Sequence, residues 1–108
     1  MIFKNAKNDA YTYDYIPDRD THDILIDLRE KPLYHLGTIP GAVNIPIDDM
    51  GQLFELQKDR KILLFCQVGE ISAEIAALMQ DAGYKAYHLP GGYRHYLREI
   101  IASDTTEA

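Results

Sequence analysis

Short apolar runs, each entered from polar residues, divide the chain at three places. Residues 24–28 and 61–65 consist mostly of Ile, Leu and Phe, the pattern of strands that are buried on both faces. Residues 85–89 form the third run, which stops at a Pro-Gly-Gly turn signal. A shorter apolar segment, residues 42–45, is a candidate for one further strand. The pattern therefore predicts three buried strands and a brief fourth.

Helical periodicity fills much of the chain between these runs. Apolar residues recur at spacings of three and four in residues 72–82, where Gly83 ends the pattern, and again in residues 93–101. Residues 49–57 form a shorter helical candidate. Such aliphatic and aromatic stripes are typical of helices that pack on a core.

One strand-helix-strand unit indicates where a functional site can lie. Strand 61–65, helix 72–82 and strand 85–89 follow one another, and such a crossover is right-handed with its two strands parallel. Ligands of open parallel sheets bind beyond the carboxyl ends of the strands. The loops that follow residues 28, 65 and 89 should therefore meet at one edge of the sheet.

The two ends of the chain carry weaker patterns. We expect a loosely held arm over residues 1–9, one domain over residues 10–102 and a short tail over residues 103–108. Tyrosines alternate with polar residues over positions 11–15, the period of a half-buried strand. An irregular aromatic cover on the core fits the same residues.

Composition narrows the classes of partner. The 108 residues suffice for one domain, and 46% hydrophobic and 26% charged residues are ordinary for a globular protein. The formal net charge is −6, from 11 basic and 17 acidic residues. Nucleic acids and anionic membranes need a basic surface, so neither is an expected partner, whereas a protein with a basic face remains one.

The segment that follows Met1 lacks the apolar stretch of a signal peptide, and no run approaches the ~20 apolar residues of a membrane helix. We therefore expect a cytoplasmic protein. A single cysteine suits a reducing compartment and excludes an internal disulfide or a two-cysteine redox cycle. We expect no cofactor and no metal, because the four histidines are scattered and lack a ligand pair at a zinc spacing. These are His22, His35, His88 and His95.

Cys66, the only cysteine, is the first residue beyond the apolar run 61–65. A glycine-containing polar loop follows it and leads into the predicted helix, so the thiol should face the unpaired N–H groups at the start of that helix. Such an environment favours a thiolate. The alternative is a structural cysteine, since free cysteines are often small buried hydrophobes.

Three segments of the chain match one known family. The first is Asp27-Leu28-Arg29 at the end of a strand, and the second is Gly37-Thr38-Ile39-Pro40-Gly41-Ala42-Val43-Asn44-Ile45-Pro46. The third runs from Cys66 to Ser72 and continues through the helix to Gly83-Tyr84 and Leu89-Pro90-Gly91-Gly92. From about Tyr11 to Arg98 the sequence resembles a single-domain rhodanese, a sulfurtransferase that forms a persulfide. The resemblance implies an α/β, rhodanese-like three-layer fold, with a central, mostly parallel sheet and helices on both faces.

Three positions depart from the family pattern. Thr38 stands where the family usually has histidine, and Tyr96 where it often has tryptophan. Ile71 stands where the active loop usually carries an arginine, beside the acidic Glu70. That arginine would help to hold anionic donors such as thiosulfate. The departure at Ile71 therefore predicts weak use of thiosulfate.

The same resemblance implies roles for the loop. Cys66 is the expected catalytic nucleophile, which takes sulfur from a donor such as a cysteine desulfurase or a small persulfide and passes it to a thiol or protein acceptor. The backbone of the loop is expected to cradle the sulfur, with Gly69 allowing the turn and Ser72 either bonding the sulfur or capping the helix. The expected loop residues are Gln67, Val68, Gly69, Glu70, Ile71 and Ser72.

Four residues elsewhere are candidates for the rim of the site. Asp27 and Arg29 end a buried strand, where a charge normally needs a partner, and we expect Asp27 to form a supporting ion pair. Arg29 is also a candidate for assisting anions in place of the missing loop arginine. Arg94 and His95 follow the Gly-Gly turn, and we expect them on a helix surface.

Other protein classes explain less of the chain. A phosphatase or arsenate reductase of related fold needs an arginine around its oxyanion, and a monothiol thioredoxin-like protein leaves residues 37–46 unexplained. The alternative that stays open is a rhodanese-like binding or regulatory module with weak catalysis. Loss of the loop arginine favours this alternative, whereas Cys66 and Gly69 favour sulfur transfer.

Overall fold

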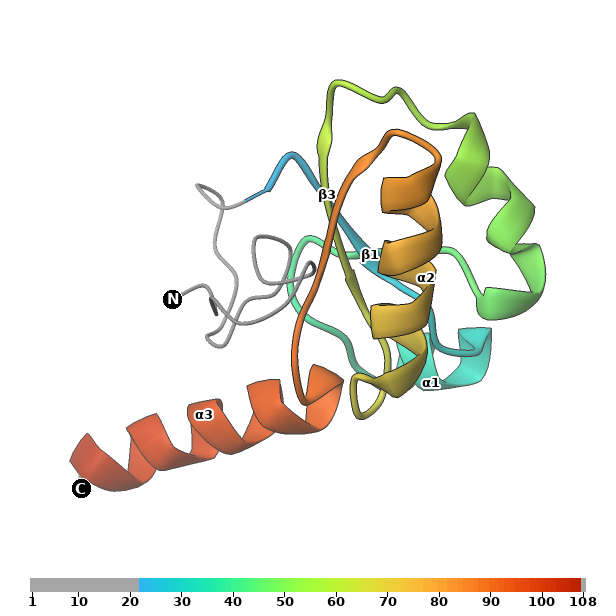
Figure 1. The fold of residues 1–108 in the computed structure, drawn as a ribbon. Helices are drawn as coiled ribbons and strands as arrows, with labels where there is room; N and C mark the ends of the chain where they lie inside the picture. The colour runs from blue at the N-terminus through green and yellow to red at the C-terminus, as the bar shows by residue number, and fades with distance from the viewer. Residues whose placement is uncertain (1–21, 108) are drawn as a thin grey trace.

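Four parallel strands form the sheet of the computed structural model, which describes residues 22–107 and, of these, the side chains of residues 22–102 (Figure 1). The strands lie in the order β2 (Val43–Asn44), β1 (Ile24–Asp27), β3 (Lys61–Phe65) and β4 (Lys85–His88). All the pairings are parallel. The four runs predicted from the sequence are thus strands, and the α/β class is confirmed.

Each face of the sheet carries its own apolar cluster, because successive side chains of a strand point to opposite faces. On one face, α2 (Glu70–Asp81) and the 3-10 helix η2 (Ile47–Glu55) pack over the cluster (Figure 1). That cluster contains Ile26, Leu53, Ile62, Leu64, Ile75, Met79 and Ala86. The opposite cluster contains Leu25, Leu63, Phe65, Leu89 and, from the start of α3 (Gly92–Glu107), Tyr96.

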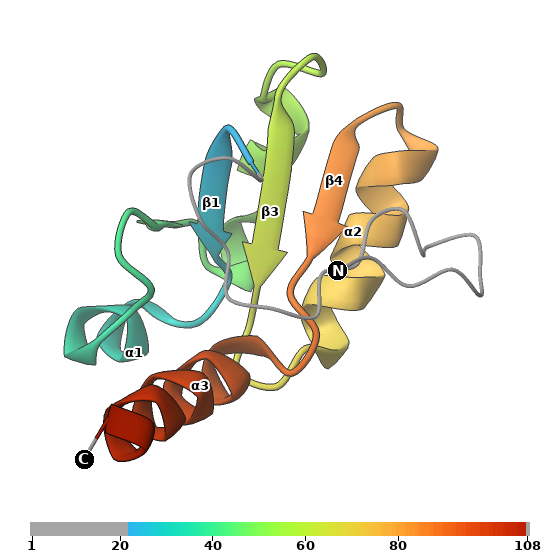
Figure 2. The ribbon, with the colours of Figure 1, turned by 90° about the vertical axis from the view of Figure 1, so that its left-hand side faces the viewer.

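The strand order reverses between β1 and β3, which are neighbours in the sheet although β2 separates them in the chain. Ligands of open parallel sheets bind outside the carboxyl ends of the strands at such a reversal. Asp27 pairs with Phe65, and Leu64 with His88, so β1, β3 and β4 end at nearly the same level. The loops after these strands converge on one edge, where α1 and α3 also begin (Figure 2).

The helix α1 (Lys31–Leu36) was not predicted from the sequence. It has six residues, none of them buried, so it shows no apolar stripe. Its signals are local, namely Pro32 in its first turn and Gly37 just after its end. Neither residue identifies a helix by itself, because both are also common in turns.

Other helices differ in their bounds or type from those predicted from the sequence. The third predicted helix is α3, which continues to Glu107 and so includes most of the predicted tail. The helix predicted over residues 49–57 is η2, which is 3-10 and is interrupted by a kink at Asp49. The predicted arm over residues 1–9 and the tyrosine strand over 11–15 lie outside the described residues. Within residues 22–107, no helix is both long and apolar enough to cross a membrane.

Candidate active site

The Cys66 side chain is buried at the end of β3, directly at the start of α2. The backbone N–H of Gly69 donates to its Sγ at 3.1 Å, and the N–H of Ser72 donates to it at 3.4 Å. Both N–H groups belong to the first turn of the helix, where no intrahelical carbonyl is available to them. Two donors and the positive end of the helix dipole therefore stabilise a negative charge on this sulfur.

Two glycines make this arrangement possible. Gly69 is the N-cap of α2 with φ +100°, and a Cβ there would lie 2.8 Å from the Gly91 nitrogen. Gly92 has φ +61°, and a Cβ there would collide with the Cys66 carbonyl oxygen. The turn after β4 therefore lies against the loop after β3. Tyr93 completes the junction by donating its N–H to the Cys66 carbonyl at 2.8 Å.

Ser72 connects the sulfur to a histidine. Its buried Oγ lies 3.5 Å from Cys66 Sγ and 3.3 Å from His88 Nδ1, and it also lies 3.2 Å from the Gly69 carbonyl. It makes no side-chain cap of α2, because the N-cap is Gly69 and the hydroxyl is the donor to that residue's carbonyl. Burial lowers the pKa of His88 below the usual value of a histidine, because it disfavours the charged ring. The imidazole is thus neutral near pH 7.

Asp27 and Arg29 form an ion pair at the end of β1, with 2.8 Å between Asp27 Oδ2 and Arg29 Nη2. Arg29 also donates through Nε and through its backbone N–H to Asp27 Oδ1, at 3.0 and 2.9 Å. Thr38, at the position where the family usually has histidine, donates its hydroxyl to Asp27 Oδ2 at 2.8 Å. The Asp27 carboxylate thus holds Arg29 in the loop after β1, and through Thr38 it also binds the segment that precedes β2.

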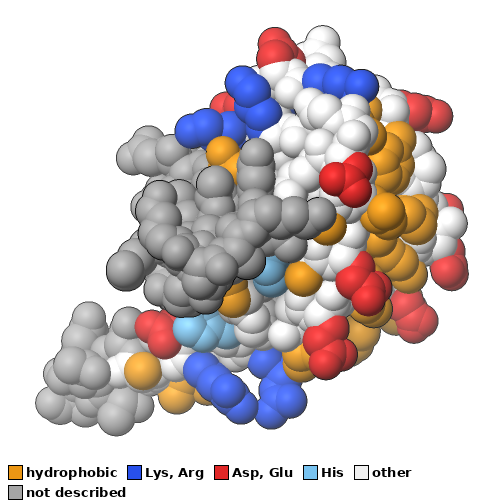
Figure 3. All heavy atoms as spheres, in the orientation of Figure 1, with side chains coloured by type: hydrophobic (Ala, Val, Ile, Leu, Met, Phe, Trp, Pro, Cys, Tyr) orange, Lys and Arg blue, Asp and Glu red, His pale blue; other side chains and the backbone are white. Residues whose placement is uncertain are grey.

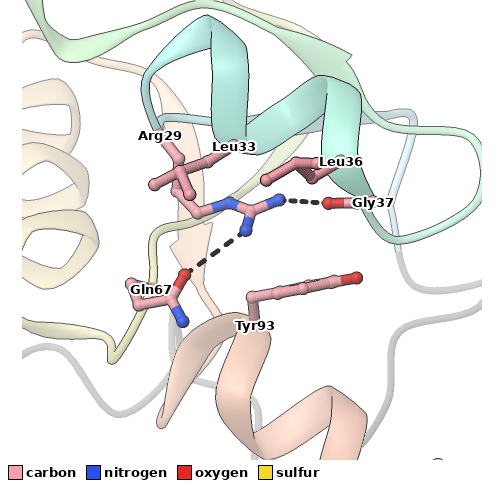
Figure 4. Close-up of a pocket in the computed structure, with 6 residues that line it drawn as sticks. All are labelled: Arg29, Leu33, Leu36, Gly37, Gln67 and Tyr93. Carbon is pink, nitrogen blue, oxygen red and sulfur yellow. Dashed lines mark hydrogen bonds between the residues drawn. The ribbon is translucent and has the colours of Figure 1, made fainter.

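A pocket of about 230 Å³ opens beside this pair, between α1 and the start of α3 (Figure 4). Arg29 lies in its centre, donating to the Gly37 carbonyl at 2.6 Å and to Gln67 Oε1 at 3.3 Å. The guanidinium lies over the Tyr93 ring, 4.1 Å from the ring centroid. Leu33 and Leu36 of α1 complete the lining.

The contacts of Arg29 limit what it can do for a ligand. Its Nε is used by Asp27, its Nη2 by Asp27 and Gly37, and its Nη1 by Gln67. Its charge is matched by the carboxylate of Asp27, which is fully buried. Arg29 therefore stabilises the rim, and it leaves little donor capacity for an anionic substrate.

The remaining predicted loop residues face outward. Val68 and Ile71 are 43% and 46% exposed, and Glu70 is exposed as well. Arg94 is exposed on α3, whereas His95 is half-buried and its Nε2 has no hydrogen-bond partner among the described residues. The loop thus surrounds the sulfur with backbone and presents apolar and acidic side chains to solvent.

Three residues of the site were not predicted from the sequence. They are His88, Tyr93 and Thr38, the last as a partner of Asp27. A signal existed for His88. It ends the strand 85–88 two positions after Ala86, so it points to the same face as α2. Parallel pairing with β3 then places it at the level of the loop that carries Cys66.

The exposed side of α2 carries the acidic residues Glu70, Glu74 and Asp81, together with the apolar Ile71 and Leu78. In Figure 3, acidic and apolar side chains intermix on the side occupied by α2, while the basic side chains visible in this view gather at its upper and lower ends. Within the described part of the chain, no three His, Cys, Asp or Glu side chains are grouped to hold a metal ion. The electrostatics next to Cys66 thus combine a local donor cradle with an acidic surface.

Comparisons with known proteins converge on one family. A family model described as the rhodanese-like domain matches residues 10–99. A tRNA sulfurtransferase of Desulfurococcus amylolyticus is 34% identical over 73 residues, which are 68% of this chain and 14% of that protein. A tRNA uridine(34) hydroxylase of Bdellovibrio bacteriovorus is 38% identical over 88 residues, 74% of this chain and 25% of that protein.

A solved structure of a human single-domain sulfurtransferase superposes with a TM-score of 0.60 and 27% identity, covering 69% of this chain and 80% of that one. The curated relatives are much longer proteins, since the chain spans 14% to 37% of their length. What they share with this chain is therefore a domain.

Proposed function

Because the chain belongs to the rhodanese-like domain family, we propose that it is a sulfurtransferase or persulfide carrier that moves sulfane sulfur through Cys66. The observation that carries this proposal is the cradle at the start of α2, where Gly69 and Ser72 donate N–H groups to Sγ. Donors that already point at the sulfur stabilise both a thiolate and the persulfide anion that replaces it.

The transfer has two steps. The Cys66 thiolate attacks the outer sulfur of a donor persulfide, the S–S bond of the donor breaks, and the donor leaves as a thiolate. An acceptor nucleophile then attacks the outer sulfur now on Cys66 and restores the Cys66 thiolate. One cysteine suffices for both steps.

The donor that fits the site best is a persulfide on a protein or a polysulfide. Thiosulfate is a small dianion, and the loop offers it Ile71 and the acidic Glu70 where an arginine would bind it. Arg29 does not replace that arginine, because its N–H groups are directed to Asp27, Gly37 and Gln67. Catalysis with thiosulfate is therefore weak.

The partner that fits the surface is a protein with a basic face around its own persulfide, such as a cysteine desulfurase. The exposed acids lie on α2, and the first turn of this helix donates an N–H group to Cys66 Sγ. Charge complementarity near the sulfur would therefore orient the two proteins. The tRNA named for the longer relatives fits this chain poorly as a partner. Its net charge of −6 lacks the basic footprint of a nucleic-acid surface.

The proposal is tested by turnover, with cyanide as acceptor and thiocyanate as the measured product. With cysteine persulfide as donor, the wild type should turn over, Cys66→Ser should fall to the uncatalysed rate, and thiosulfate should be used more slowly by the wild type. A wild type that does not exceed the uncatalysed rate with either donor would contradict the proposal. That result would favour the second candidate, a binding or regulatory module, which the missing loop arginine supports.

A further inference from the structure

His88 lies at the end of a short chain of polar groups that starts at the reactive sulfur. Cys66 Sγ is 3.5 Å from Ser72 Oγ, and Ser72 Oγ is 3.3 Å from His88 Nδ1. The three residues come from β3, α2 and the end of β4, so three separate elements bring them together. Neither step of sulfur transfer described above uses the histidine.

We infer that His88 is a positioning residue that accepts the thiol proton of Cys66 through the hydroxyl of Ser72, which makes the thiolate available for attack. This inference rests on the proposed function, because it concerns the nucleophile of that reaction. It adds a source for the thiolate besides the donor cradle, which stabilises the anion but takes up no proton.

The proton transfer balances without any further reactant. The S–H bond of Cys66 breaks and the sulfur keeps the electron pair, Ser72 Oγ gains this proton, and the former hydroxyl proton moves to His88 Nδ1. After the thiolate has attacked the outer sulfur of R–SSH, the leaving R–S⁻ takes the proton that His88 holds. The sum is Cys66–SH + R–SSH giving Cys66–SSH + R–SH, with no net change in protons.

The state of the imidazole fits this role. A histidine accepts a proton only when it is neutral, and burial lowers the pKa of His88, so the ring stays neutral to a lower pH than an ordinary histidine. Burial causes this shift by disfavouring the charged ring, so His88 holds the proton only until the leaving thiolate takes it. The titratable group that faces it across Ser72 is Cys66.

Ser72 has one hydroxyl proton and two acceptors for it, His88 Nδ1 and the Gly69 carbonyl. The relay operates when this proton points to Nδ1, which requires the tautomer that carries its hydrogen on Nε2. A purely structural role, in which Ser72 and His88 only hold the loop, uses the same contacts. The two roles differ in how the reactivity of the thiol depends on pH.

The test measures the rate of Cys66 alkylation by iodoacetamide as a function of pH, in the wild type, Ser72→Ala, His88→Gln and His88→Asn. The relay predicts that the variants react about tenfold more slowly at pH 7, because a free thiol with a pKa near 8.5 is only a few per cent ionised there. Above about pH 9.5 the variants should converge with the wild type, since the thiol then ionises without a base. His35→Gln, an exposed histidine of α1, serves as the matched control and should follow the wild type throughout.

A loss of rate that is the same at every pH would assign a structural role to the pair and overturn the inference, as would variants that match the wild type at pH 7. Two substitutions at position 88 and one at position 72 keep the test decisive if one variant does not fold. Alkylation needs no sulfur donor, so its outcome is independent of turnover. Failure of the relay and failure of sulfur transfer are therefore told apart.

Discussion

At the scale of single residues, the chemistry depends on where β3 stops. Phe65 is fully buried in the core, whereas Cys66, the next residue, receives N–H donors from Gly69 and Ser72. One position earlier, the same thiol would be a small hydrophobic side chain without donors. The reactivity proposed for Cys66 would thus depend on the loop backbone around it, and substitutions that move this backbone should alter it.

Gly69→Ala tests that dependence. Position 69 has φ +100°, and a Cβ there would lie only 2.8 Å from the Gly91 nitrogen. The substitution should therefore lower the unfolding free energy by about 1–3 kcal/mol and displace the N–H that faces the sulfur. Urea unfolding and the alkylation rate of Cys66 measure the two effects. The matched control is Gly51→Ala, where a Cβ meets nothing within 4 Å and φ is not positive, so both quantities should stay near wild type. Equal behaviour of the two variants would contradict the described loop geometry.

Ile71→Arg should raise the use of thiosulfate. Ile71 is 46% exposed in the first turn of α2, so an arginine fits there without burying its charge, and it adds a planar donor fork beside the sulfur. We expect kcat/KM for thiosulfate to rise about tenfold, from roughly one charge-assisted hydrogen bond, with little change for cysteine persulfide.

Leu78→Arg is the control for Ile71→Arg, because it adds the same charge at a 50% exposed position of the same helix, about two turns away. It should leave thiosulfate use unchanged. An equal rise in both variants would mean that net charge, and not the place of the arginine, determines the rate. A wild type that already uses thiosulfate efficiently would contradict the expectation that the missing loop arginine limits this donor.

At the scale of elements, the site exists because three parallel strands end at one level and their loops bond to one another. The Asp27–Arg29 pair joins the loop after β1 to the Gly37 carbonyl and to Gln67 in the loop after β3. Gly92 lets the turn after β4 approach the Cys66 carbonyl. A substitution in one loop should therefore weaken the others.

Asp27→Asn should destabilise the fold by about 3–5 kcal/mol, because it leaves the buried guanidinium of Arg29 without its carboxylate. The midpoint of urea unfolding should fall accordingly. Asp59→Asn, in an exposed turn before β3, should change the unfolding free energy by no more than about 0.5 kcal/mol. A loss below about 1 kcal/mol for Asp27→Asn would show that the pair contributes little to stability.

The sequence predicted elements whose pattern comes from burial. The strands and α2 carry apolar runs or stripes because they face the core, so their existence was predictable, as was the placement of Cys66 between them. The helix α1 buries none of its residues and left no such pattern. The end of α3 also differs from the prediction, since the helix continues past residue 101 to Glu107.

The parts of the site that could not be predicted are contacts between distant segments. His88 reaches Ser72 only because β4 pairs with β3, and Tyr93 meets Arg29 only because α3 begins beside α1. The composition of the loop does not reveal these neighbours. That Asp27 needs a partner was predictable, because it is a charge at the end of a buried strand. That Thr38 is a second partner is visible only in the folded structure.

At the scale of the whole molecule, charge should govern which donors reach the site. The chain has a net charge of −6, and Glu70 and Glu74 are exposed near the loop that holds Cys66. A basic protein donor would therefore be steered towards this face, whereas a small persulfide would not be. The two kinds of donor should respond differently to ionic strength.

Raising the salt concentration from about 0.1 M to about 1 M shortens the screening length from ~10 Å to ~3 Å. Sulfur delivery from a basic protein persulfide should slow by about tenfold or more, and delivery from cysteine persulfide should change by less than about twofold. The rates are measured by stopped-flow mixing. Replacing Glu70 and Glu74 together with Gln should flatten the salt dependence. A salt-independent rate for the protein donor would argue against a docking role of the acidic face.

The central claim is that Cys66 carries one sulfur atom, and intact-mass analysis tests it most directly. After incubation with a persulfide donor, the wild type should gain the mass of one sulfur atom, cyanide should remove it, and peptide mapping should place it on Cys66. Cys66→Ser should gain nothing. A wild type without this gain, or a gain that persists in Cys66→Ser, would contradict the account.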